Sequence, residues 1–359
     1  MSGSSTQPPD PTGLGDMNDI IFVSLGMIVM DEIRFPDGKV LSHVPGGSGL
    51  YSTLGARLAV TDVTNSGRVG CLALAGSDFP VSVVDTLKSW GITLCLQQAD
   101  DRLSTRGLLQ YQGTNFKDRV FSYTTAPLQP TPADLTNRIP LLRSVAFHLL
   151  ASPQDFELSA QQLQAIRHAD GVLTKPLLAW EPAPASCRSS FRDEHLKAAK
   201  LAHIYSPNHT ELLAVFHDVE EPSLVFDRDT IQDIALQLLE SGVGPDGQGA
   251  VVVRCEEHGS FAVSKAYTGR WFPAFYSGNS SKVVDATGAG NAFLGGATAK
   301  LAEGAGLTEA VIMGTVAASF AIEQIGLPER AGEGKGETWN GVGVLSRIEA
   351  YRAKMEKNY

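Results

Sequence analysis

The sequence predicts an α/β fold: a doubly wound, mainly parallel sheet flanked by helices, with a small β lid. Three observations predict it. The continuous apolar run Ile20 to Met30 is typical of a central parallel strand that is buried on both faces. Between residues 145 and 205, short apolar runs alternate with helical patterns, as in successive β-α units. Near the C-terminus, Gly288, Gly290 and Gly295 mark a tight turn between a β-branched run and a helix.

Composition restricts the classes of function. Hydrophobic residues make up 43% and charged residues 19% of the 359 residues, and no apolar run approaches the ~20 residues of a membrane span. The net charge of -10 argues against a nucleic-acid partner, because such binding depends on Lys and Arg neutralising phosphates. The four cysteines are scattered without metal-ligand spacing, so we expect reduced thiols.

The first 18 residues are rich in Pro, Gly and Ser and lack the basic start and apolar core of a secretory signal. We expect residues 1–18 to be a disordered tail and the protein to be cytoplasmic. Residues 19–359 are expected to form one domain, with lid hairpins at about 31–45 and 104–124. The first hairpin turns at Pro36 to Gly38 and the second at Gln112 to Asn115.

The first strand is expected to end at Asp31. Ligands of α/β sheets bind at the carboxyl ends of central strands, so Asp31 is either a ligand-binding carboxylate or a loop residue that caps its own backbone. Gly46 and Gly47 then open a helix that carries Tyr51.

The middle of the chain alternates strands and helices. We expect strands at 145–150, 177–180, 203–205 and 250–254, and helices at 156–168 and 191–201. His148 lies inside an apolar strand and is interpreted as a core histidine. Asn208 and Glu211 have the spacing of a helical capping box. Two further helices are expected, from Thr308 to Gln324 and from Val344 to Lys357.

The segment from Val283 to Gly296 reads as a strand, a turn and the start of a helix at Ala289. Such a turn either presents the free N–H groups of the helix to an anion or only allows the helix to pack closely on the sheet. The pattern alone leaves both interpretations open.

The turn resembles a known signature. Its residues follow the D-T-x-G-A-G-D-x-F pattern of the ribokinase-like (PfkB) carbohydrate and nucleoside kinases, matching at Asp285, Thr287, Gly288, Ala289, Gly290, Ala292 and Phe293. Asn291 stands where that family has its catalytic aspartate. The resemblance covers roughly Ile20 to Pro328 and implies a ribokinase-like fold.

The resemblance also implies roles for single residues on the acceptor side. Asp31 would bind substrate hydroxyls, with Gly46 and Gly47 against the substrate and Tyr51 at the position of a family asparagine. Gly288, Ala289 and Gly290 would form the anion hole beside Asn291, and Asp285 would lie at a monovalent cation site for K⁺.

On the nucleotide side, Asn208 and Glu211 would organise Mg²⁺ and the phosphates of ATP, Glu211 acting through water. Arg254 replaces a family threonine and is either a new cation near the phosphates or a surface salt bridge, the second being slightly favoured. The remaining nucleotide contacts would be Gly259, Thr315, Ala318 and Ser319. Lids of this family also dimerise in some members, so we expect a monomer or a lid-mediated homodimer.

Two hypotheses for function follow. The first is an ATP- and Mg²⁺-dependent phosphotransferase that acts on a hydroxyl of a small metabolite such as a sugar or nucleoside, held between Asp31 and Asn291. The second is an impaired pseudokinase that serves as a nucleotide-binding or scaffold protein, since a general base contributes ~10² to 10⁴ in rate. The departures at Tyr51, Glu181, Arg254 and Asn291 indicate a divergent branch, one that we associate with fungi.

Overall fold

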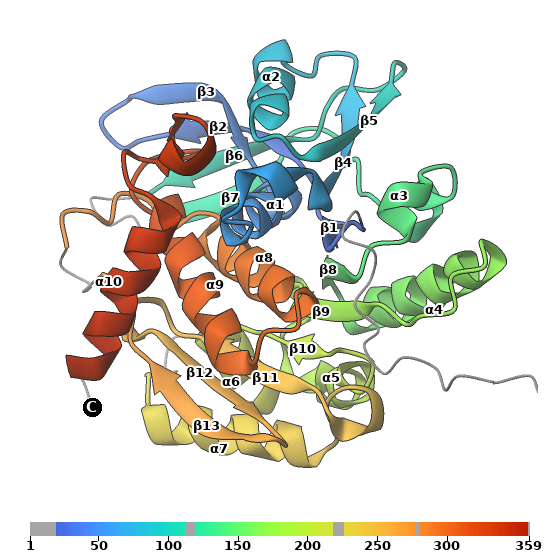
Figure 1. Ribbon diagram of the computed structural model, residues 1–359, viewed down its shortest axis with the longest axis vertical. Coiled ribbons are helices and arrows are strands. Elements are labelled where there is room, and N and C mark those ends of the chain that lie inside the picture. The colour runs from blue at the N-terminus through green and yellow to red at the C-terminus, as the bar shows by residue number, and fades with distance from the viewer. Residues whose placement is uncertain (1–18, 113–118, 218–225, 277–279, 358–359) are drawn as a thin grey trace, which may run out of the picture.

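The computed structural model describes residues 19–112, 119–217, 226–276 and 280–357 (Figure 1). Its main sheet has nine strands in the order β13-β12-β11-β10-β9-β8-β1-β4-β5. The strands from β11 to β5 in that order are parallel, and only the pairs β11/β12 and β12/β13 are antiparallel. They comprise β1 (Phe22–Ser24), β4 (Val69–Gly76), β5 (Thr93–Ala99), β8 (Ala146–Ala151), β9 (Leu177–Pro182), β10 (Ile204–Tyr205), β11 (Ala250–Arg254), β12 (Ser260–Ser264) and β13 (Tyr267–Phe272).

Helices cover both faces of this sheet, which confirms the predicted doubly wound α/β fold. One face packs against α1, α2, α8, α9 and α10, and the other against α3 to α7, each face with its own hydrophobic core. None of these helices, within the described ranges, is long and apolar enough to cross a membrane. They are α1 (Ser48–Ala59), α2 (Val81–Ser89), α3 (Ile139–Leu142), α4 (Pro153–Ala169), α5 (Arg192–Ala199), α6 (His209–Phe216), α7 (Arg228–Glu240), α8 (Ala289–Ala302), α9 (Leu307–Ala321) and α10 (Val344–Lys357).

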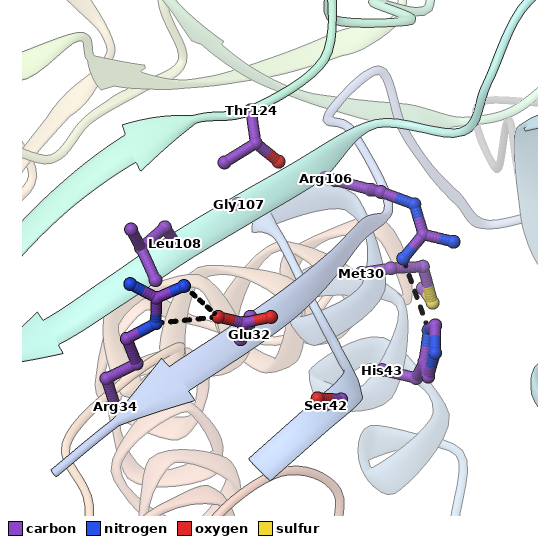
Figure 2. Close-up of a pocket in the computed structure, with 9 residues that line it drawn as sticks. All are labelled: Met30, Glu32, Arg34, Ser42, His43, Arg106, Gly107, Leu108 and Thr124. Atoms are coloured by element: carbon purple, nitrogen blue, oxygen red, sulfur yellow. Dashed lines mark hydrogen bonds and ion pairs between the residues drawn. The ribbon is translucent and has the colours of Figure 1, made fainter. Parts of the chain in front are cut away.

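The lid is a separate sheet of four strands in the order β3-β2-β6-β7. The predicted hairpins are β2 (Val29–Arg34) with β3 (Val40–Gly46) and β6 (Arg106–Tyr111) with β7 (Arg119–Tyr123), and β2 pairs with β6 in parallel. One face of this sheet is polar, with Glu32 beside Arg34 and His43 beside Arg106 (Figure 2). Most of the second predicted turn, residues 113–118, lies outside the described residues, as does the predicted tail 1–18.

The prediction of one strand from Ile20 to Met30 is wrong. β1 ends at Ser24, and the chain crosses to the lid before β2 begins at Val29. The segment between β1 and β2 packs tightly against the start of α1, as Gly26 shows: a Cβ atom there would lie 2.4 Å from Ser48 Oγ. Asp31 therefore lies inside a lid strand and not at the end of a central strand.

The predicted strand before the glycine turn is also wrong. Residues 283–285 form a loop whose backbone N–H groups, at Val284 and Asp285, donate to the carbonyl of Ile322 just beyond α9. Because these N–H groups pair with a residue at the end of α9 and not with a strand, the β-branched residues here do not join the sheet. α9 itself begins at Leu307 and ends at Ala321, slightly before the predicted bounds.

Helices α1 and α8 approach each other closely through paired glycines. A Cβ atom on Gly55 would lie 1.9 Å from the carbonyl oxygen of Ala292, and one on Gly295 would lie 1.9 Å from that of Ser52. Neither backbone can retreat, because both helices are buried against the sheet. This contact fixes where the N-terminus of α8 lies.

We predict that Gly295→Ala lowers the free energy of unfolding by about 1 to 3 kcal/mol, the usual cost of overpacking a core. Urea denaturation followed by circular dichroism measures it. The control is Gly67→Ala, where the nearest atoms would be 3.9 Å from the new Cβ. Equal stability of the two variants would contradict a rigid α1/α8 contact.

Candidate functional site

The N-terminus of α8 forms a cradle of backbone N–H groups. Gly288 caps the helix in the left-handed region at φ 78°, and a Cβ atom there would lie 2.2 Å from the ring of Tyr51. The N–H group of Ala289 donates to Ala286, whereas those of Gly290 and Asn291 have no backbone acceptor among the described residues. Free N–H groups at a helix N-terminus favour an anion.

Tyr51 packs against this cradle. Its side chain is buried, its ring packs on Gly288, and its hydroxyl donates to the carbonyl of Gly326 at 3.1 Å. The phenol is thus already occupied, and its position favours a packing role over the predicted contact with substrate.

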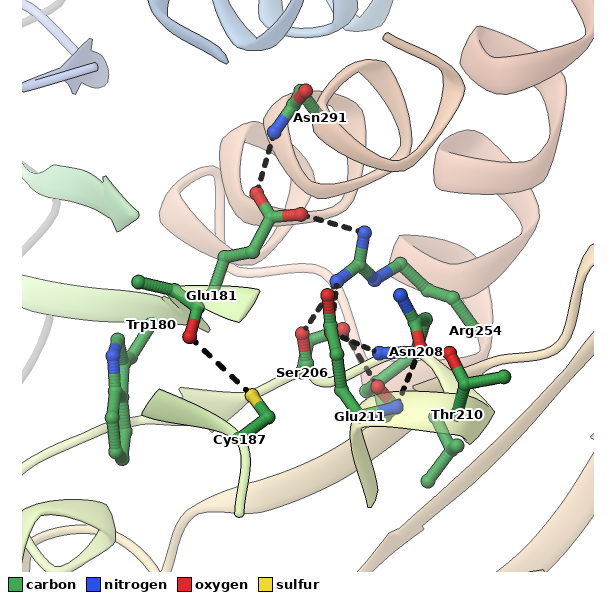
Figure 3. A network of polar contacts seen from close by, with 12 residues as sticks. Trp180, Glu181, Cys187, Ser206, Asn208, Thr210, Glu211, Arg254 and Asn291 are labelled. Carbon is green, nitrogen blue, oxygen red and sulfur yellow. Dashed lines mark hydrogen bonds and ion pairs between the residues drawn. The ribbon is translucent and has the colours of Figure 1, made fainter. Parts of the chain in front are cut away.

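Asn291 follows the cradle and is fixed by Glu181. Its Nδ2 donates to Glu181 Oε2 at 2.6 Å, and the other carboxylate oxygen, Oε1, accepts from Arg254 Nη1 at 2.7 Å (Figure 3). His148 Nε2 lies 3.2 Å from Glu181 Oε2. Burial would raise the pKa of Glu181, but Arg254 and His148 outweigh it and hold that pKa at about 2. Glu181 is therefore an anion at neutral pH.

His148 is the satisfied core histidine that the sequence predicts. It is fully buried, and its Nδ1 lies 3.0 Å from the hydroxyls of both Ser24 and Ser52. Through this ring the Glu181 carboxylate is connected to strand β1 and helix α1.

Arg254 is not a surface residue, so the favoured interpretation as a surface salt bridge is wrong. Its guanidinium is largely buried, donates to the carbonyl of Ser206 at 2.9 Å and lies 3.6 Å from Glu211 Oε2. A Cβ atom on Gly290 would lie 2.1 Å from Arg254 Nη1. The cation therefore lies directly beside the cradle, as the other interpretation requires.

Asn208 and Glu211 form the predicted capping box at the start of α6. Asn208 Oδ1 accepts from the Glu211 N–H at 2.8 Å, and Glu211 Oε2 accepts from the Asn208 N–H at 2.7 Å. Burial raises the pKa of Glu211 to about 7, although Arg254 opposes the shift. Glu211 Oε1 is not used by the cap, so this carboxyl group fits a contact to a metal-bound water.

Asp31 lies on lid strand β2, near enough to the cradle segment for the charge of Asp285 to act on its carboxyl group. A Cβ atom on Gly46 would lie 2.5 Å from Asp31 Oδ2, and one on Gly107 would lie 2.3 Å from Oδ1. The side chain is 7% exposed, and Oδ1 has no hydrogen-bond partner among the described residues. Burial, with the charge of Asp285 second, raises the pKa of Asp31 to about 7. Gly47, at φ 93°, turns the chain where a Cβ would meet the carbonyl of Met27.

Arg119 connects the lid to the cradle segment, and no sequence motif marked it. Its Nη1 donates to Thr287 Oγ1 at 2.8 Å and lies 3.4 Å from Asp285 Oδ1. The same Asp285 oxygen accepts from the N–H and hydroxyl of Thr287. Asp285 Oδ1 is therefore already bound to a guanidinium and two donors, and the K⁺ site at Asp285 stays a prediction.

The other predicted nucleotide contacts are mainly buried. The hydroxyl of Ser319 donates to Val316 and accepts from Arg347, and the hydroxyl of Thr315 donates to Val311, whereas Ala318 is partly exposed. Gly259, at φ 91°, forms the turn before β12, where a Cβ would lie 1.9 Å from the carbonyl of Phe272. Of this set, Thr315 and Ser319 are buried, whereas Gly259 and Ala318 are partly exposed.

Relatives of the chain are similar over nearly its whole length. An uncharacterized protein of Schizosaccharomyces pombe is 31% identical over 93% of both chains, and protein MAK32 of Saccharomyces cerevisiae is 29% identical over 94% of both. Cytidine kinase of Thermococcus kodakarensis is 24% identical over 81% of this chain and 92% of its own.

Among solved structures, ribokinase from Giardia lamblia superimposes with a TM-score of 0.68 at 16% identity, covering 94% of this chain and 99% of its own. The fold is therefore ribokinase-like, with the lid sheet beside the main sheet. The model of the pfkB family carbohydrate kinases matches residues 15–330. The chain belongs to the pfkB carbohydrate kinase family.

Proposed function

We propose that this protein is an ATP-dependent phosphotransferase that moves the γ-phosphate to a hydroxyl of a small metabolite. One observation carries the proposal: Asp31, with one unpartnered carboxyl oxygen, lies on the lid near a segment whose helix N-terminus has two free N–H groups and a buried guanidinium. An acceptor hydroxyl on Asp31 and a phosphate on the cradle would lie next to each other. Kinase relatives of the same family support the assignment.

In the proposed reaction the acceptor oxygen forms a bond to the γ-phosphorus, and the bond from that phosphorus to the ADP oxygen breaks. The hydroxyl proton passes to an oxygen of the transferred phosphoryl group. The N–H groups of Gly290 and Asn291, together with Arg254, would stabilise negative charge on the transferring group. Glu211, acting through water, would help to hold a Mg²⁺ ion, which would supply positive charge against the triphosphate.

Asn291 can accept a hydrogen bond from the acceptor but cannot take its proton. Its amide is also held by Glu181, which fixes the direction of its oxygen. Phosphoryl transfer has a loose transition state in which positioning and charge stabilisation dominate, so slow turnover is expected without a base.

The second candidate is a nucleotide-binding protein without turnover. The amide of Asn291 and the phenol of Tyr51 are both engaged by other residues of the chain, at positions where the family has groups that contact the acceptor. Such a protein would still bind phosphate at the cradle but would not catalyse phosphoryl transfer.

We predict that ATP with Mg²⁺ raises the melting temperature of the full chain by several degrees, because binding to the folded state alone stabilises it. Differential scanning fluorimetry measures the shift. Gly288→Val should remove it, since the side chain meets Tyr51 and the left-handed backbone disfavours β-branching. Gly290→Ala should reduce it, since the new Cβ would lie 2.1 Å from Arg254 Nη1 and displace the guanidinium beside the cradle. No shift in the wild-type protein at millimolar nucleotide would refute both candidates.

A second prediction concerns Asp31→Asn. The folded-state pKa of about 7 lies above the ordinary value of 3.8, so wild-type stability falls as pH rises through this window. The variant lacks this loss: its stability should match the wild type at pH 4 and exceed it at pH 8, as urea titrations would measure. Its ATP-induced shift should remain while use of the acceptor falls. Loss of ATP binding would show that Asp31 belongs to the nucleotide half of the site.

A third prediction concerns Asn291→Asp. Alone, it places a second carboxylate where the amide now lies 2.6 Å from Glu181, so the melting temperature should fall. Combined with Glu181→Gln, which donates to the new carboxylate, it should raise turnover by up to ~10²-fold. ADP release over a panel of alcohols is the measurement. A wild-type turnover above ~10 s⁻¹, the typical enzyme value, would show that Asn291 does not limit the rate.

A further inference from the structure

Arg254 contacts two separate parts of the candidate site. It is the last residue of β11, where its backbone N–H donates to the carbonyl of Pro207 at 3.1 Å, immediately before the capping box of α6. Its side chain reaches from there to Gly290 at the start of α8 (Figure 3). One guanidinium therefore lies beside both the proposed metal-organising segment and the proposed phosphate cradle.

The fold holds this guanidinium in place without using all of its donors. Nη1 donates to Glu181 Oε1 at 2.7 Å, and Nη2 donates to the carbonyl of Ser206 at 2.9 Å. The side chain is 12% exposed, and Nε has no partner among the described residues. A guanidinium has five N–H donors, so this one is anchored at two atoms and keeps donors for a ligand.

The charge nearest to the cradle residue Gly290 is that of Arg254 and not that of Glu181. The three heavy atoms nearest to a Cβ atom built on Gly290 all belong to Arg254: Nη1 at 2.1 Å, Cζ at 3.3 Å and Cδ at 3.8 Å. Gly290 and Asn291 are partly exposed, and their N–H groups have no backbone acceptor among the described residues. An anion that accepts from these N–H groups would therefore lie beside the guanidinium.

The other side of the same guanidinium lies beside Glu211, to which the proposed function assigns a metal-bound water. Nη2 of Arg254 is 3.6 Å from Glu211 Oε2. A fixed positive charge is thus present between Glu211 and the cradle, where a metal ion would act on the phosphates. A guanidinium forms direct, paired hydrogen bonds to phosphate oxygens, and it keeps its charge at every ordinary pH.

The rest of the molecule does not favour a polyanion. The net charge of the chain is -10, and the carboxyl groups of Asp31 and Asp285 lie close enough to influence each other near the cradle. General electrostatic attraction therefore does not explain binding of an uncomplexed polyphosphate here. Such binding would depend on the local donors, which are Arg254 and the N–H groups of Gly290 and Asn291.

We propose that Arg254 is a resident cation of the nucleotide site, through which the protein binds the phosphates of ATP without a divalent metal. The ligand class is an uncomplexed polyphosphate, which accepts hydrogen bonds from Arg254 and from the cradle. The inference rests on the nucleotide site of the proposed function, but it does not require turnover. Mg²⁺ then adds little to the affinity for ATP.

The test is calorimetric titration of the full chain with ATP, in one buffer with Mg²⁺ and in another with EDTA. The ratio of the two dissociation constants is the metal dependence of binding. We expect it to be less than about tenfold in the wild-type protein, since one charged hydrogen bond contributes about that much. Inorganic tripolyphosphate, which has no nucleoside, should displace ATP in the EDTA buffer.

Two variants assign the effect to Arg254. Removing the arginine alone would leave Glu181 as an unpaired buried anion, so the first variant is Glu181→Gln with Arg254→Gln, which removes both charges. The second is Gly290→Ala, whose Cβ atom displaces the guanidinium and leaves both charges in the chain. Each should raise the metal dependence, the first by about tenfold or more.

The matched control is Arg143→Gln with Asp170→Asn. It removes a guanidinium and a carboxylate that form an exposed pair at 3.3 Å, before β8 and β9 and thus at the opposite edge of the sheet. Its metal dependence should equal that of the wild-type protein. Circular dichroism of each variant checks that it is folded.

Binding of ATP in the Mg²⁺ buffer alone would overturn the inference and leave the phosphotransferase standing. Absence of binding in both buffers would overturn both. A metal dependence that neither variant raises would give Arg254 a structural role only and overturn the inference, as would ATP that tripolyphosphate does not displace. ADP release is measured in parallel. Metal-free binding through Arg254 with no ADP release from any alcohol would support the inference and refute the phosphotransferase.

Discussion

A single buried carboxylate, that of Glu181, connects three strands of the main sheet to the start of α8. It accepts from Asn291 on α8 and Arg254 on β11 and contacts His148 on β8. Removing one partner from such a group is expensive, because the remaining charge stays buried and unpaired. The cradle, the Arg254 guanidinium and His148 therefore depend on one another. A change to any one of them alone would lower the stability of the fold.

This dependence gives a physical reason for the amide at position 291. Four carboxyl groups, those of Asp31, Glu181, Glu211 and Asp285, already surround the site, where the described residues provide the two guanidiniums of Arg119 and Arg254. A fifth carboxylate beside Glu181 would meet a like charge in a poorly solvated position. An amide of nearly the same shape donates to Glu181 instead. Asn291 and Arg254 thus both donate to Glu181, one through a neutral amide and the other through a charged guanidinium.

Periodicity and turn chemistry predicted most of the fold, including β11 and α10 to the residue, because each rests on a local pattern. The prediction of one strand from Ile20 to Met30 was wrong, because apolar residues that belong to two different sheets give the same sequence pattern as one long strand. The cradle was predictable from its glycines. The burial of Arg254 and the reach of Arg119 were not, because both depend on side chains brought together across more than 70 residues of chain. Likewise, nothing in the sequence around Tyr51 indicates that its hydroxyl donates to the carbonyl of Gly326.

The position of Asp31 on β2 changes how the two halves of the site relate. The proposed acceptor contact, Asp31, lies on the lid sheet, whereas the proposed phosphate contacts lie on α8 and β11 of the main body. Arg119 joins these halves, since it extends from β7 to Thr287 immediately before the cradle. In the proposed transfer, alignment of acceptor and phosphate would therefore require the lid to be seated on the cradle segment. Arg119, which belongs to no motif, would thus help to set the distance between the proposed reacting groups, because its bond to Thr287 connects β7 to the segment just before α8.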